Sequence, residues 1–227
     1  MAKSKTTHSY IIPIAKQFAQ HQNIEDAAGA KAYMRNQFEF YGLKTPLRRQ
    51  LTKEYIKKNK PDYKDLERIT IELWSFPQRE FQYFAIELIA SLKKQWDIKI
   101  IDLIEFIIVN KSWWDTVDFA ASELTGPYFQ LFPQQIKSIT GRWNKSENFW
   151  LLRSSIMFQK AYKKNTDADL LSKYILRHKD SKEFFIQKAI GWALREYSKT
   201  NPQWVKSFIK KNPLAPLSKR EGLKRIN

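Results

Sequence analysis

The sequence predicts an all-α protein built as a superhelical stack of antiparallel helical hairpins. Apolar residues recur at spacings of three and four through most of the 227-residue chain, which contains only six glycines. Strand-type alternation bounded by Asn-Gly or Asp-Gly turns is missing. The third observation is a period of about 35 residues, because Pro77, Ser112, Ser146 and Ser181 follow one another at intervals of 35, 34 and 35 residues.

Start and stop signals place the helices in chain order. In the first part, Thr45-Pro46 sets a cap before a first-position proline, and Gly42 ends the segment before it. The helices expected there are 9–21, 24–36, 46–59, 63–74, 77–95 and 98–109.

In the second part, three serines precede aromatic-rich amphipathic runs and are expected to cap them: Ser112, Ser146 and Ser181. Gly126-Pro127, Asn165 and Asn201-Pro202 are the expected stops. The helices expected there are 112–125, 134–143, 147–162, 167–177, 182–199, 203–211 and 217–225.

Two helices lie between successive caps, as in repeats of the HEAT or tetratricopeptide kind, in which no single pair buries its apolar face alone. We therefore expect HEAT-like antiparallel helical repeats whose concave, basic face is built from the same helix of each pair. The expected organisation is a flexible basic N-terminal tail over residues 1–8 and one continuous domain over residues 9–227.

The composition limits the classes of function. Forty Lys and Arg residues against 23 Asp and Glu give a formal net charge of +17, so we expect an anionic partner, nucleic acid first and an acidic membrane surface second. No cysteine is present, which excludes disulfides, thiolate nucleophiles and cysteine-based metal sites. No signal peptide or membrane-spanning run is recognised, so we expect a soluble cytoplasmic protein associated with the nucleoid.

The repeat period relates three polar residues to one another. Asp118, Arg153 and Lys188 follow at intervals of 35 residues, so they occupy equivalent positions of successive repeats. One turn before each lies an aromatic residue: Trp114, Phe149 and Phe184. If one helix per repeat lines the concave face, these polar residues line it together.

The string Ser112 to Asp118 is the most unusual part of the chain. Trp114 and Asp118 share one helix face, and Trp113 and Val117 share the neighbouring face, which we expect to point to the core. Both tryptophans could be packing residues, with the acids favoured by the helix dipole. However, a carboxylate on a phosphate-binding surface repels DNA, so a DNA-facing Asp118 requires a chemical reason.

Two further positions have both a structural and a functional interpretation. Trp192 lies one turn from Lys188 and about one turn from Arg195; it is either a buried indole or one wall of a cleft for which Gly191 leaves room. Arg153 is either an ion-paired or solvated cation, or a ligand for phosphate. The lysine clusters at helix ends are individually solvated surface, although collectively they favour salt-sensitive duplex binding.

Other chemistries are not supported. The three histidines, His8, His21 and His178, lack metal-ligand spacing. The chain has neither a glycine-rich phosphate loop nor a Gly-x-Ser-x-Gly motif. We expect no metal, no cofactor and no bound nucleotide.

Three segments resemble the AlkD-type DNA alkylation repair family, alkylpurine DNA glycosylases built from HEAT-like repeats. They are KSWWDTVD at 111–118, SKEFFIQKAIGWALREY at 181–197 and LAPLSKRE at 214–221, with support from 45–49 and 72–74. The resemblance covers nearly the whole chain beyond the first eight residues.

The resemblance implies roles for single residues. Trp114 and Asp118 correspond to the catalytic pair, with Trp192 across the cleft. Arg153 corresponds to a residue near the DNA backbone and Tyr33 to an aromatic near the lesion strand. We also expect the two cations that flank Trp192 to bind DNA, namely Lys188 and Arg195.

The implied activity is that of a monofunctional glycosylase in base excision repair, which hydrolyses the N-glycosidic bond of N3- and N7-alkylpurines in duplex DNA. These bases are cationic and leave without a general acid, and a carboxylate can stabilise the sugar cation that forms. Two alternatives stay open: a non-catalytic duplex-DNA or damage-binding protein, and a scaffold for an acidic protein. We expect a monomer.

Overall fold

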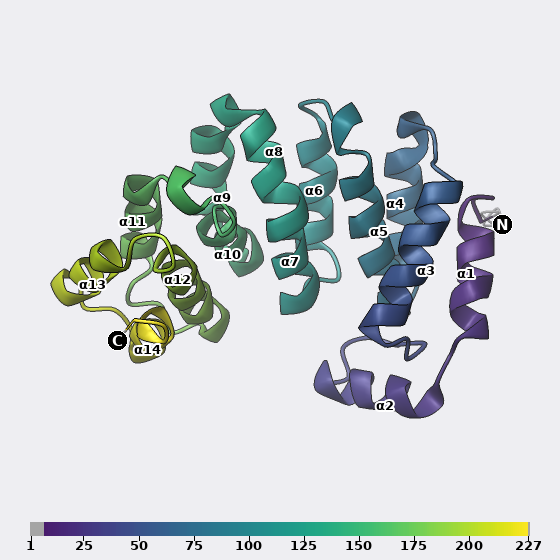
Figure 1. Cartoon of the computed structure of the whole chain (residues 1–227), viewed down its shortest axis with the longest axis horizontal. Coiled ribbons are helices and arrows are strands. Elements are labelled where there is room, and N and C mark those ends of the chain that lie inside the picture. The colour runs from purple at the N-terminus through teal and green to yellow at the C-terminus, as the bar shows by residue number, and fades with distance from the viewer. Residues whose placement is uncertain (1–6, 227) are drawn as a thin grey trace. The chain divides into compact units, whose positions relative to one another are not determined.

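The computed structural model describes residues 7–226, and within that range the chain is all-α, with one isolated bridge between Glu39 and Gln78 in place of any strand (Figure 1). Its contacts form two compact units, Met1–Asp97 and Ile98–Asn227. A single domain over 9–227 stays a prediction. Most of the expected N-terminal tail lies outside the described residues, but His8 donates its backbone N–H to Glu72 Oε1 at 2.9 Å.

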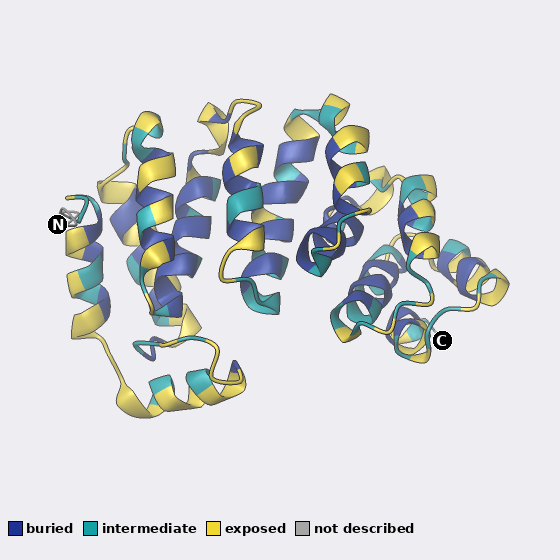
Figure 2. Ribbon diagram, turned by 180° about the vertical axis from the view of Figure 1, so that it is seen from behind, coloured by how far each residue is buried: buried dark blue, intermediate teal, exposed yellow. Residues whose placement is uncertain are grey.

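Over residues 7–97, the first unit consists of five α-helices and two short 3₁₀ turns. In chain order they are α1 (Ile11–Gln20), α2 (Ile24–Tyr33), α3 (Thr45–Lys58), η1 (Tyr63–Asp65), α4 (Leu66–Ser75), α5 (Arg79–Ser91) and η2 (Lys93–Gln95). Its core joins Phe18 of α1 to Phe81 and Phe84 of α5. In contrast, α2 contains no buried residue and is teal or yellow along its length in Figure 2.

A buried carboxylate fixes the segment that follows α2. Glu80 accepts the backbone N–H groups of Tyr41, Gly42 and Leu43 at 3.0 to 3.3 Å. Burial raises the pKa of Glu80, and these N–H groups partly oppose that rise. Gly42 has φ of +85°, and a Cβ there would lie 2.2 Å from the Asn23 carbonyl oxygen, so the close approach to the start of α2 requires glycine.

The second unit is a series of helical hairpins. Its elements are α6 (Ile100–Val109), α7 (Trp114–Ala120), η3 (Ala121–Thr125), α8 (Gly126–Leu131), η4 (Pro133–Gln135), η5 (Ile136–Thr140), α9 (Gly141–Trp143), α10 (Phe149–Met157), η6 (Lys163–Asn165), α11 (Ala168–Arg177), α12 (Phe184–Tyr197), α13 (Pro202–Lys211) and α14 (Pro216–Leu223). We call α6, η5–α9, α11 and α13 the first helices, and α7, α10, α12 and α14 the second helices. Among the second helices, α10 packs against α7 and α12, and α12 packs against α14.

The expected stop at Gly126-Pro127 is wrong. The helix begun at Trp114 continues through a π-helical turn, Ala121–Thr125, and then through α8 with Pro127 in its first turn. Proline has no N–H to donate, and widening the preceding turn accommodates its ring. Gly126 is needed for a different reason: a Cβ there would lie 2.8 Å from the Phe158 carbonyl oxygen.

The serine caps are also placed wrongly by the sequence. The side chain of Asn148 caps α10 through Trp150 N, and that of Glu183 caps α12 through Phe185 N. Ser146 and Ser181 lie two residues earlier, where each hydroxyl oxygen accepts the N–H of the capping residue at 3.1 to 3.2 Å. The serines therefore orient the capping residues. Because this arrangement repeats at Ser146 and Ser181, it preserves the 35-residue interval between them.

Candidate functional site

The second helices bring the repeat-equivalent polar residues together. Asp118 lies in the last turn of α7 and Arg153 lies on α10. Arg153 donates from Nε to Asp118 Oδ1 at 2.7 Å and from Nη2 to Oδ2 at 2.8 Å. The Arg153 side chain is 1% exposed and that of Asp118 is 12% exposed. The site therefore contains a two-point ion pair whose carboxylate alone reaches the surface.

Arg153 has a third protein partner. Its Nη1 donates to the Phe185 backbone carbonyl on α12. With this contact, all three guanidinium nitrogens bond to protein, and the side chain is buried. In this structure Arg153 is therefore the ion-paired cation of the two interpretations, and its place near the DNA backbone stays a prediction.

Trp192, on α12, is surrounded by cations. The ring centroid lies 5.0 Å from Lys188 Nζ and 5.7 Å from Lys160 Nζ. The guanidinium carbons of Arg153 and Arg195 each lie 5.5 Å from the same centroid. Cations at these distances are attracted to an indole face. The sequence predicted an indole that offers its faces to a cationic ligand, whereas here the protein's own cations adjoin the ring.

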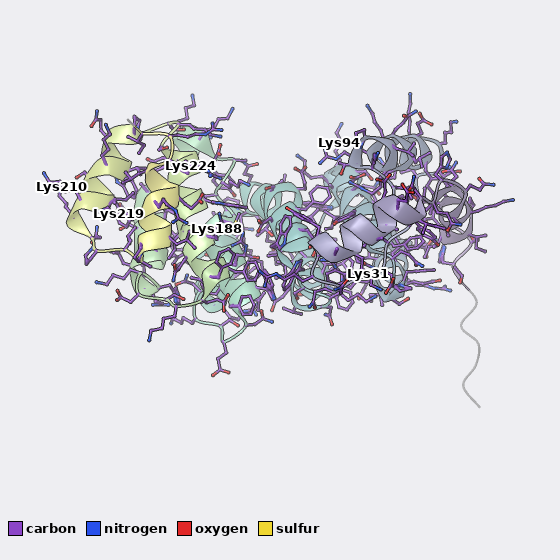
Figure 3. All side chains as sticks on the ribbon, turned by 90° about the horizontal axis from the view of Figure 1, so that it is seen from below. Lys31, Lys94, Lys188, Lys210, Lys219 and Lys224 are labelled. Carbon is purple, nitrogen blue, oxygen red and sulfur yellow. The ribbon has the colours of Figure 1, made fainter. Side chains whose placement is uncertain are left out.

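A carboxylate from the C-terminal helix holds two of these cations. Glu221 of α14 pairs with Lys188 at 3.1 Å and with Arg195 at 2.9 Å, and its side chain is 10% exposed. Burial opposes ionisation of Glu221, but Lys188, Arg195 and Lys224 together lower its pKa. Figure 3 labels Lys188, Lys219 and Lys224 around this end of the unit. Lys188 and Arg195 thus carry positive charge that a neighbouring carboxylate partly compensates.

Gly191 has a packing role. A Cβ there would lie 2.4 Å from Glu221 Cβ and 3.0 Å from the Ser218 carbonyl oxygen. The space that glycine leaves is therefore filled by α14, which occupies the room that a cleft at this residue would need. Because the two helices approach so closely, Glu221 can reach both Lys188 and Arg195.

The two tryptophans of the Ser112–Asp118 segment are both half-buried. Val117 is buried, and Trp113 packs edge-on against Phe185 with centroids 5.4 Å apart. Trp114 is half-buried at the first position of α7, one turn before Asp118. Its equivalent in the third repeat, Phe184, is 54% exposed at the start of α12. The core position expected of Val117 is confirmed, whereas Trp113 is half-buried like Trp114, and the role of Trp114 stays a prediction.

Tyr33 belongs to the first unit. It is the last residue of α2, and the residue is 71% exposed. An exposed aromatic on a helix without buried residues is compatible with the expected contact to a ligand. Its part in the site stays a prediction.

Two members of the site were missed by sequence reasoning. Glu221 ends a family-like segment and has no role predicted from the sequence, although it is the single acid between Lys219-Arg220 and Lys224-Arg225. That isolation among cations was the available signal. Lys160, the second missed member, carried no signal, because it reaches Trp192 across the stack from the C-terminal side of α10.

Within the described residues no group of three or more His, Asp or Glu side chains could hold a metal ion. No helix in that range is long and apolar enough to cross a membrane.

The chain is similar to known DNA alkylation repair proteins. The family model for DNA alkylation repair enzymes matches residues 14–226. A solved structure described as a predicted DNA alkylation repair enzyme, from Enterococcus faecalis, is 36% identical, with a TM-score of 0.84 over 90% of this chain and 96% of that one. The comparison with curated proteins finds no match.

Two solved structures from Streptococcus mutans share the fold at low identity. AlkD2 is 16% identical, with a TM-score of 0.68 over 98% of this chain and 100% of that one. The smu.31 protein of strain UA159 is also 16% identical, with a TM-score of 0.59 over 79% of this chain and 98% of that one. These likenesses support a helical repeat fold of the same type.

Proposed function

This chain belongs to the DNA alkylation repair enzyme family, and from that membership we propose that it is a monofunctional DNA glycosylase acting on N3- and N7-alkylated purines in duplex DNA. The observation that supports the proposal is a carboxylate, Asp118, whose partner is buried while its own side chain reaches the surface beside Trp114. The proposed partner is double-stranded DNA, bound by a monomer without metal or nucleotide cofactor.

Cleavage of the N-glycosidic bond of a cationic base needs few catalytic groups from the protein. Alkylation at N3 or N7 makes the purine cationic, so the C1′–N bond breaks with its electron pair passing to the base, which leaves neutral. The deoxyribose becomes oxocarbenium-like, and a carboxylate stabilises that charge. Water then adds to C1′ and loses a proton to Asp118 or solvent, leaving an abasic site.

We propose that Arg153 acts by positioning the carboxylate. A carboxylate has about four lone-pair directions, and side-on pairing with a guanidinium uses two of them. The Arg153 fork therefore fixes the orientation of Asp118 and leaves lone pairs for the sugar or for water at the exposed edge. The same pairing weakens the field of the carboxylate, so orientation is the main contribution of Arg153.

Trp192 then has a different role from the one expected of a free indole. Its ring gathers Lys188, Arg195 and Lys160, and two of these are also held by Glu221. We propose that this cluster binds the phosphates that flank the lesion. Trp114 is the aromatic face proposed to meet the cationic nucleotide, an interaction worth about 0.5–2 kcal/mol.

Base release is the test of this function. Duplex DNA carrying 7-methylguanine or 3-methyladenine is incubated with the protein, and released bases are identified by chromatography. We expect release of both, with negligible release of uracil, because a neutral base needs leaving-group activation that the site does not supply. Equal release of uracil and 7-methylguanine would contradict the proposal.

One observation favours a second candidate, a non-catalytic binder of duplex or damaged DNA. Both oxygens of Asp118 are bonded to Arg153, as in a purely structural ion pair. This candidate predicts salt-dependent duplex binding, with no base released during long incubation at protein excess. The same chromatography distinguishes the two functions.

A further inference from the structure

The second unit has a basic groove outside the candidate site. It has a volume of about 850 Å³ and is lined mainly by the first helices η5–α9 and α11. The candidate site is built from the second helices α7, α10, α12 and α14, and none of its residues named above lines the groove. The groove is therefore a separate surface of the same helical stack.

The groove is rich in uncompensated positive charge. Five cations line it, and no carboxylate does: Lys137, Arg142, Lys145, Lys173 and Arg177. All five are exposed, and only Arg142 forms an ion pair among residues 7–226, with Glu105 at 2.6 Å. Counting that glutamate, the groove carries a net charge of +4. The candidate site, with four cations and two carboxylates, carries +2.

Hydrogen bonds between neighbouring repeats join the two sides of the groove. The hydroxyls of Thr140 and Tyr174 are 2.7 Å apart, which ties η5 to α11. His178, just after α11, bonds to the Asn144 carbonyl oxygen at 2.8 Å. The lysine and arginine side chains of the groove therefore come from helices that are hydrogen-bonded to each other.

We infer that this groove binds the sugar–phosphate backbone of a second duplex DNA segment, while the candidate site holds the first. Exposed cations without carboxylate partners release counterions when they meet phosphates, which is the main source of sequence-independent DNA affinity. The hydroxyls of Ser138 and Ser146 add donors for phosphate oxygens. An acidic peptide would also seek apolar anchors, but Trp143 and Leu151 are buried at the floor.

Two DNA surfaces on one chain make it a bridge between segments. A protein held on one duplex by the groove could then search a neighbouring duplex with the site, because the first contact raises the effective concentration of the second. This inference goes beyond glycosylase chemistry and requires only that the site bind duplex DNA.

Bridging is measured by energy transfer between two undamaged duplexes, one labelled with a donor and the other with an acceptor, at one protein per two duplexes and low salt. The test variant is K137Q/K145Q/K173Q. The control, K16Q/K93Q/K94Q, removes the same charge from exposed lysines of the first unit that form no ion pair within residues 7–226.

We expect wild type and control to bridge, and the groove variant to lose affinity for the second duplex by about tenfold or more. The slope of log affinity against log salt should fall by about 2.7 for three lost phosphate contacts. All three proteins should release 7-methylguanine from a single methylated duplex at the same rate. Bridging without any base release would remove the glycosylase proposal and leave this inference standing.

Three results would overturn the inference. The first is no energy transfer with wild type. The second is an equal effect in groove variant and control, which assigns bridging to net charge or to a protein dimer. The third is a groove variant that binds polyglutamate more weakly than wild type but binds the second duplex equally well. This result would make an acidic protein the partner of the groove.

Discussion

Asp118 and Arg153 form an ion pair across two successive repeats, with Nε–Oδ1 and Nη2–Oδ2 distances of 2.7 and 2.8 Å. The arginine is almost completely buried and the aspartate is exposed at one edge. Arg153 is therefore held inside the fold, whereas the carboxylate of Asp118 has an edge that a ligand can reach. This asymmetry underlies the proposed division between positioning by Arg153 and chemistry by Asp118.

Arg153→Lys distinguishes the effect of the positive charge at this position from the effect of the planar guanidinium geometry. Lysine keeps the cation but loses the planar fork, so we expect a loss of about 2 kcal/mol in unfolding free energy and at least about tenfold in base release. Arg153→Ala removes the buried member of the ion pair and leaves the partly exposed Asp118 carboxylate without its partner, which should cost about 3–5 kcal/mol. Urea denaturation gives the stability, and single-turnover release gives the rate. A lysine variant with the wild-type release rate would argue against positioning.

Glu221→Gln tests the linkage between α14 and α12. The folded pKa of Glu221 is lowered, so its contribution to stability is present above the unfolded value near 4.5 and is lost as pH falls through the folded pKa. At pH 7 we expect the variant to be about 2 kcal/mol less stable than wild type, with the gap closing at acid pH. Thermal unfolding across pH measures this gap. Glu123→Gln, at an exposed position, is the control and should show no gap.

Gly191→Ala tests the contact that excludes a cleft above α12. A methyl group would meet Glu221 Cβ at 2.4 Å, and we expect a loss of about 1–3 kcal/mol despite the better helix propensity of alanine. Gly29→Ala, in α2, meets nothing within 4 Å and should gain up to about 1 kcal/mol. Chemical denaturation of both variants gives the comparison. Stabilisation of both would mean that α14 does not pack against Gly191.

Trp192→Phe and Lys188→Gln distinguish the contribution of the indole ring to DNA binding from that of the lysine charge. We expect the phenylalanine variant to bind duplex DNA more weakly with an unchanged salt slope, because no cation is lost. The glutamine variant should reduce the slope by about 0.9, the value for one phosphate contact. Fluorescence anisotropy at several salt concentrations measures both slopes. An unchanged slope for Lys188→Gln would remove Lys188 from the proposed phosphate cluster.

The periodicity of the sequence predicted the fold class and part of the candidate site. Helical spacing predicted the all-α class, and the 35-residue interval correctly related Asp118, Arg153 and Lys188, because repeats place equivalent residues on neighbouring helices. The partner of a charged group is set by tertiary packing, so sequence alone could not decide whether Arg153 meets phosphate or carboxylate. For the same reason the sequence leaves open whether Gly191 borders a cleft, whereas in the structure it admits α14.

Local stop signals predicted the helix ends less well than the 35-residue interval predicted the repeats. Gly126-Pro127 is a strong stop signal, yet a π-helical turn carries the helix through it, at the point where Tyr162 donates its hydroxyl to the Gly126 carbonyl oxygen at 2.7 Å. That stabilisation comes from a residue far along the chain. Glu221 was overlooked for a related reason, since its role depends on how closely α14 approaches α12.

The most direct measurement of the central claim is single-turnover release of 7-methylguanine by Asp118→Asn. Asparagine has the size of aspartate but no charge, so we predict that release falls by about 100-fold or more while duplex affinity stays within about threefold of wild type. A circular dichroism melt establishes that the variant is folded despite its weakened pairing with Arg153. Release at the wild-type rate by the folded variant would contradict the role of Asp118 in the reaction.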